Sequence, residues 1–161
     1  MRLPRLAKPV WRAALPMGAL SAALVWLVFL AHGGVRGTAD EGTVLPLALF
    51  FLEALAYGYA GFRVRRQGLS PKDSALAGAL AGLLTELLAG FWRTSLLLFS
   101  RSYMAWIQHA KHPNLALNQI PWPPFTVLAA LIGVVLAGIA IGAAAGAIGG
   151  SFAEQPHSAR P

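Results

Sequence analysis

The sequence predicts an all-α integral membrane protein, a bundle of four transmembrane helices, from its composition, its apolar runs and the position of its charges. Of 161 residues, 57% are hydrophobic and only 12% are charged, whereas a soluble domain of this size needs a far more polar surface. Four apolar runs reach the roughly 20 residues that a helix needs to cross the hydrocarbon core, and none alternates as barrel strands do. We therefore expect one membrane domain over residues 1–161, with spans at about 13–31, 43–62, 74–99 and 125–152.

The first run, residues 13–31, carries no charged residue and follows a basic stretch, as the core of a signal peptide does. It is longer than a usual signal core, and no clear Ala-x-Ala cleavage site follows it. We therefore expect a retained first helix. Pro4 and Pro9 argue against a regular helix before this run, and we expect the N-terminal segment to lie along the membrane surface.

Helix-start signals support the other boundaries. Ser70 precedes Pro71 and lies three residues before Asp73, which is the pattern of a capping box with proline in the first turn. Pro46 and Pro124 likewise fall at the beginnings of the second and fourth runs. Proline is harmless there because the first N–H groups of a helix have no helical partner.

The topology follows from the distribution of Lys and Arg. Nine of them lie in the two tails and the loop between the second and third runs, against three in the other two loops. The positive-inside rule therefore predicts that both termini are cytoplasmic. The Ala/Leu/Arg-rich usage is typical of a GC-rich bacterium, so the expected location is a bacterial inner (plasma) membrane. The net charge of +7 is then explained by membrane lipid as a partner rather than by nucleic acid. The residues expected to contact anionic lipid are Arg63, Arg65, Arg66 and Lys72.

The segment 100–124 is expected to be an interfacial loop whose aromatic residues lie at the membrane surface. His109 and His112, three residues apart, have the spacing to share a metal, but no acid or thiol nearby completes a ligand set. His32 is a possible axial ligand for a haem or chlorophyll. A single histidine near a membrane interface, however, usually has no ligand role. We expect no metal and no cofactor.

Glycines recur every three or four residues in the last three runs, with Glu86 in the place of one glycine in the third run, so that they lie on one face of each helix. Small residues let helices approach closely in lipid, where no hydrophobic force drives them together. The pattern favours helix packing over a pore or a gating surface, either within the bundle or against a neighbouring subunit. The glycines expected to pack are Gly58, Gly61, Gly78, Gly82, Gly90, Gly138, Gly142, Gly146 and Gly150.

Two glutamates lie near the middle of apolar runs, Glu53 in the second and Glu86 in the third. A carboxylate costs a few kcal/mol at mid-bilayer and should face protein or water. Tyr57 is one turn from Glu53, where its hydroxyl could bond the carboxyl group. Arg93 lies almost on the face of Glu86 and can reach back toward it. The short loop between the two runs predicts antiparallel neighbours, so both carboxyl groups fall at similar depth.

Two interpretations of these four residues remain open. Glu53, Tyr57, Glu86 and Arg93 could form an ion, proton or polar-ligand site. Alternatively, the carboxyl groups are protonated or paired and hydrogen-bond between helices or to a partner subunit. If the two carboxyl groups are close, they resist joint ionisation, and one of them keeps its proton.

The stretches YGYAGFRVRR (57–66) and SALAGALAG (74–82) resemble small Gly/Ala-rich four-helix bacterial membrane proteins of unknown function. In that group a second helix ends in a cluster of small residues and arginines, and a third opens with an Ala-Gly run. The resemblance covers about half the chain, implies the same fold and carries no functional residues across. The long aromatic loop and Arg93 depart from that pattern.

No catalytic residue is expected, because the sequence has no cysteine, phosphate-binding glycine loop, nucleophile elbow or HExxH motif. The composition favours a non-enzymatic accessory or structural subunit that packs through its glycine-rich faces against other membrane subunits or a second copy of itself. The alternative is a small transporter or channel that uses Glu53 and Glu86. An intramembrane enzyme is the least favoured class.

Overall fold

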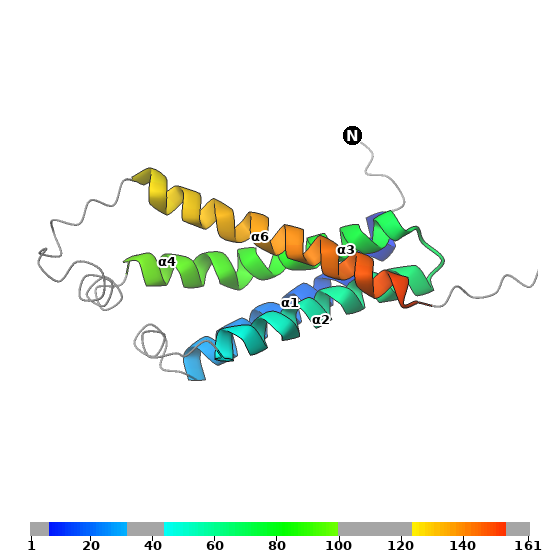
Figure 1. The fold of residues 1–161 in the computed structure, drawn as a ribbon, viewed down its shortest axis with the longest axis horizontal. Coiled ribbons are helices and arrows are strands. Elements are labelled where there is room, and N and C mark those ends of the chain that lie inside the picture. Colours follow the sequence, from blue (N-terminus) through cyan, green and yellow to red (C-terminus); the bar gives the residue numbers. More distant parts are fainter. Residues whose placement is uncertain (1–6, 32–43, 100–123, 154–161) are drawn as a thin grey trace, which may run out of the picture.

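The computed structural model describes residues 7–31, 44–99 and 124–153, which are almost entirely helical (Figure 1). Four segments are long and apolar enough to cross a membrane, which confirms the predicted all-α fold with four apolar helices of spanning length. The expected interfacial segment 100–124, apart from Pro124, and all four histidines lie outside the described residues. The elements are α1 (Ala7–Ala31), α2 (Val44–Arg66), α3 (Pro71–Thr85), η2 (Glu86–Gly90), α4 (Phe91–Phe99) and α6 (Pro124–Ser151).

The helices run up and down, and α3, η2 and α4 together form the third span. The start of α1, the turn between α2 and α3 and the end of α6 lie at one end of the bundle (Figure 1). We call this the basic end, because its described cations are Lys8, Arg12, Arg63, Arg65, Arg66 and Lys72.

Pro9 does not prevent a helix, contrary to expectation, whereas Pro4 lies outside the described residues. Helix α1 begins at Ala7 and includes Pro9 in its first turn. Pro9 needs no hydrogen bond there, since the first four N–H groups of any helix lack partners within it. Helix α1 therefore begins six residues before the predicted boundary at residue 13.

The turn between α2 and α3 is built as predicted, except that α2 continues to Arg66 instead of ending at residue 62. Ser70 N donates to Oδ2 of Asp73 at 3.0 Å, and Asp73 N donates to Oγ of Ser70 at 3.3 Å, which completes the capping box. Gly68 has a φ of +79°, a conformation that glycine adopts without strain. The guanidinium of Arg65 donates to the Leu69 carbonyl at 2.8 Å and so stabilises this turn from α2.

The glycine faces of α2, α3 and α6 contact one another inside the bundle. A Cβ atom at Gly78 would lie 2.7 Å from Cα of Gly146, and one at Gly149 would lie 2.7 Å from Cα of Gly58. Backbones approach this closely only where side chains are absent. The same close approach of backbones within the chain accounts for six of the predicted packing positions, Gly58, Gly61, Gly78, Gly82, Gly142 and Gly146. A Cβ atom at Gly138 would instead meet the side chain of Glu86, and one at Gly150 would meet the side chain of Ser74.

The remaining core consists mostly of alanine and valine, together with a few larger side chains. Helix α1 covers α2 and α3 through a cluster of fully buried residues in which Tyr57 is the largest. This cluster comprises Val10, Ala13, Ala14, Tyr57, Ala60, Val64, Ala77 and Ala81. Helix α6 closes the other side of α3 and is the least buried of the four spans.

Candidate intramembrane polar site

The third span contains a π turn at the position of its glutamate, a feature that the sequence did not predict. The N–H of Phe91 donates to the carbonyl of Glu86, five residues earlier, whereas an α-helical N–H donates to the carbonyl four residues earlier. A π turn holds one residue more than an α turn, which rotates the residues after it by about 100°. Such turns inside α-helices occur frequently at functional sites. The expectation that Arg93 lies almost on the face of Glu86 assumed an unbroken α-helix. The π turn between the two residues rotates Arg93 away from that expected position.

Two glycines make room for the side chain of Glu86. A Cβ atom at Gly90 would collide with its Oε2, and one at Gly138 of α6 would lie 3.1 Å from its Oε1. Gly90 was expected to pack against another helix. In the described structure, the neighbour of Gly90 is instead the carboxyl group from its own π turn. The carboxyl group of Glu86 therefore lies between its own helix and α6.

Glu53 projects from α2 toward this same region. The charged groups that act on its carboxyl group are Glu86 and Arg93, so three residues from α2, η2 and α4 lie within electrostatic range of each other. Both glutamates are half-buried. Neither carboxyl group makes a hydrogen bond to any side chain or backbone group in the part of the chain that is described.

Tyr57 completes the group from the face of α2 that carries Glu53. Its side chain is 1% exposed, and its Oη is buried without a hydrogen-bond partner among residues 7–31, 44–99 and 124–153. The expected bond to Glu53 is therefore not formed. The polar neighbour of this hydroxyl is Thr85, and Glu53 and Glu86 also act on it, but the Tyr57–Thr85 pair does not reach hydrogen-bond geometry.

Thr85 is a residue that sequence reasoning missed. It is fully buried, and its Oγ1 lies 3.0 Å from the carbonyl of Ala81 and 3.3 Å from the carbonyl of Gly18. Its single proton is therefore directed at backbone carbonyls of α3 and α1. Its oxygen remains an acceptor on the side of Tyr57. The only signal in the sequence was a threonine directly before a mid-membrane glutamate.

Arg93 supplies the positive charge of the site. It attracts both carboxyl groups, yet its Nε is buried and has no hydrogen-bond partner in the described residues. The site thus contains two buried donors without a hydrogen-bond partner, this Nε and the hydroxyl of Tyr57. It also contains two carboxyl groups that make no hydrogen bond to a described residue. Buried polar groups in native proteins are rarely left in this state unless water or a ligand satisfies them.

The chemistry available to this group is that of proton and cation binding. Carboxyl oxygens accept bonds from a hydronium ion, a water molecule or a small cation, and the phenol can donate to the same guest. The described residues hold no group of three or more His, Cys, Asp or Glu side chains suited to a metal ion. No nucleophile with an adjacent base occurs among the four expected site residues.

Comparison of the whole chain with protein-family models, with curated proteins and with solved structures gave no match. The assignment of function therefore depends on the geometry of the chain itself.

Proposed function

We propose that the protein is a small non-enzymatic membrane transporter or channel in which Glu53 and Glu86 bind a proton. The observation that carries the proposal is that two carboxyl groups lie at similar depth, within electrostatic range of Arg93 and of the Tyr57 hydroxyl. Glu53 lies 13 residues from Arg66 and Glu86 lies 15 residues from Pro71, which places both about 20 Å from the basic end at 1.5 Å per residue. An ionisable residue within a membrane span is by default a candidate member of an ion pathway or a proton relay.

The alternative interpretation, in which the glutamates only join helices, has less support. A structural carboxyl group would hydrogen-bond across a helix contact, because an unsatisfied polar group is costly in hydrocarbon. The carboxyl groups of Glu53 and Glu86 make no such bond within the described residues. A pair of carboxyl groups with free acceptor capacity is instead suited to exchange a proton with a guest water.

A second candidate function is that of a subunit in a larger membrane assembly. The predicted contact surface, the glycine faces, is already buried within the chain. A different surface of α6 favours assembly, since small residues spaced three or four apart are exposed on the face opposite its buried glycines. A Cβ atom at Gly133 would meet nothing within 4 Å, which leaves space for a neighbouring helix. This outward stripe consists of Ala130, Gly133, Ala137, Ala140, Ala144 and Ala147.

The proposed location is a bacterial inner membrane with the basic end in the cytoplasm. The support is the positive-inside rule, together with the gathering of Lys8, Arg12, Arg63, Arg66 and Lys72 at one end of the bundle. Both termini are cytoplasmic in this orientation.

Proton flux into liposomes that contain the purified protein tests the proposed function. An imposed potential is expected to drive flux in the natural protein, and Glu53→Gln and Glu86→Gln are each expected to reduce it at least tenfold. Ser95→Ala is the matched control, since the Ser95 hydroxyl bonds to Phe91 of its own helix at 2.8 Å. Flux that persists in both glutamine variants overturns the proposal.

Extraction in mild detergent, followed by mass spectrometry of the native particle, separates the two candidate functions. A fixed stoichiometry with other membrane proteins, together with an absence of proton flux in the purified chain, favours the subunit. Disruption of that assembly by Gly133→Leu and Ala137→Leu then identifies the outward stripe of α6 as the contact.

A further inference from the structure

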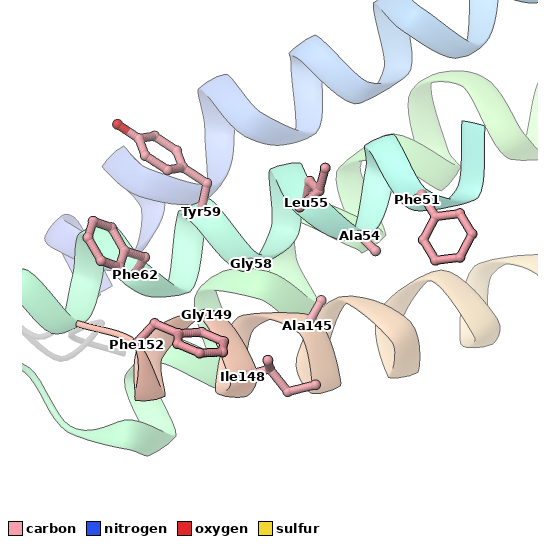
Figure 2. Close-up of a pocket in the computed structure, with 10 residues that line it drawn as sticks. All are labelled: Phe51, Ala54, Leu55, Gly58, Tyr59, Phe62, Ala145, Ile148, Gly149 and Phe152. Carbon is pink, nitrogen blue, oxygen red and sulfur yellow. The ribbon is translucent and has the colours of Figure 1, made fainter. Parts of the chain in front are cut away.

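An open apolar groove of about 420 Å³ runs between α2 and α6 on the outer surface of the bundle (Figure 2). Aromatic side chains stand along it, with Phe51 toward one end and Phe62 and Phe152 toward the other. Phe51 is 62% exposed and Phe152 is 75% exposed, so the walls stand out from the helices. The groove is lined by Phe51, Ala54, Leu55, Gly58, Tyr59, Phe62, Ala145, Ile148, Gly149 and Phe152.

The floor of the groove is formed by the closest approach of the two helices. Gly149 contacts the backbone of Gly58 so closely that a Cβ atom there would lie 2.7 Å from Cα of Gly58. Ala54 and Ala145 continue this floor. Because the floor residues are small and the wall residues are large, the groove is a built depression rather than a loose contact.

The length of the groove matches one leaflet of a bilayer. Phe51 and Phe62 are 11 residues apart on α2, a rise of about 17 Å, and half of a typical hydrocarbon core is about 15 Å. The groove runs from the middle of the span toward the basic end. A single acyl chain fits both its length and its apolar lining.

Positive charge lies within one helical turn of the groove, at the end of α2. The guanidinium of Arg66 lies 5.8 Å from the centroid of the Phe62 ring, so this arginine is anchored to the groove wall. Arg63 and Arg66 are exposed, whereas Arg65 is engaged with the carbonyl of Leu69. These two exposed guanidinium groups at the end of α2 complement an anionic phosphate.

We propose that this groove is a binding site for one anionic phospholipid of the leaflet at the basic end. One acyl chain lies along the aromatic walls, and the phosphate binds Arg63 and Arg66. The site is independent of the polar site, because Glu53 and Tyr57 project from the opposite face of α2. It therefore does not depend on the proposed transport function.

Photo-crosslinking of the full-length protein in nanodiscs tests the position of the acyl chain. The probe is a phosphatidylglycerol that carries a diazirine in one chain, and adducts are mapped by mass spectrometry. Adducts are expected to concentrate on residues 51–62 and 145–152. An even distribution over other lipid-facing residues, such as the exposed Leu20 and Leu27 of α1, overturns the proposal.

Competition between phosphatidylglycerol and phosphatidylcholine tests the headgroup contact. The double variant Arg63→Gln/Arg66→Gln is expected to weaken retention of phosphatidylglycerol about twenty- to thirty-fold in native mass spectrometry, at about fivefold for each arginine. The matched control is Lys8→Gln/Arg12→Gln, which removes two exposed charges at the same end of the bundle. Equal losses in both double variants show a diffuse charge effect and overturn a built site.

Discussion

The indole Nε1 of Trp26 in α1 donates a hydrogen bond of 2.9 Å to the carbonyl of Leu88 in the π turn. The two residues are 62 positions apart, so this bond ties the first span to the interrupted part of the third. In a membrane, backbone groups released by a break in a helix must be satisfied by neighbouring helices or by water. Trp26 provides such a partner beside the proposed proton site.

Replacement of Trp26 is expected to destabilise the π turn. Trp26→Phe keeps the aromatic contact with Phe29, whose ring centroid is 5.8 Å away, but it removes the donor to Leu88. The expected loss is about 1 kcal/mol in the free energy of unfolding in mixed micelles. Trp92→Phe is the control, since Trp92 is largely exposed, and an equal loss there contradicts a specific role for the Trp26 bond.

The hydroxyl of Thr85 is expected to stabilise the contact between α1 and α3. Thr85→Val removes the bonds to the carbonyls of Gly18 and Ala81 at nearly constant volume, with an expected cost of about 0.5–1.5 kcal/mol. Thr85→Ser retains the hydroxyl and is expected to lose less. Reversible unfolding by dodecyl sulfate measures both variants, and a serine variant as unstable as the valine variant assigns the effect to packing.

The variant Tyr57→Phe distinguishes a contribution of the Tyr57 hydroxyl to folding stability from a contribution to proton flux. Because the Tyr57 hydroxyl is buried and has no bond to a described residue, its removal is expected to leave stability unchanged or to raise it by up to about 1 kcal/mol. If the hydroxyl donates to a bound water or hydronium ion, the same variant reduces proton flux. Unfolding and flux are measured on the same preparation, and a stability loss with normal flux argues for a structural tyrosine.

The close contact between α3 and α6 predicts opposite effects for two glycine substitutions. Gly78→Ala places a methyl group 2.7 Å from Cα of Gly146, and the expected cost of this overpacking is about 1–3 kcal/mol. Gly133→Ala meets nothing within 4 Å and is expected to be neutral, or to stabilise the helix by up to about 1 kcal/mol. Unfolding in detergent compares them, and equal destabilisation at both positions would mean that the buried contact is absent.

A sequence-based prediction of the polar site was partly possible. Glu53, Tyr57, Glu86 and Arg93 are identifiable because charged and polar residues are rare in apolar runs, and the short turn between α2 and α3 makes their helices neighbours. The contribution of Thr85 was not predictable, because a single threonine is common in membrane helices. The rotation of Arg93 was also missed, since the hydrophobic pattern of a helix does not reveal a single π turn.

The sequence by itself determined the number of spans, their approximate limits, the capping box of Ser70 and Asp73 and the gathering of positive charge at one end of the bundle. These features depend on local chemistry: the length of an apolar run, the identity of a cap and the count of cations in a loop. Tertiary structure alone decided that the glycine faces are used within the chain, that Gly90 and Gly138 accommodate the side chain of Glu86, and that a groove forms between α2 and α6. These features depend on which helix faces meet, and several pairings of small-residue faces are equally compatible with the sequence pattern.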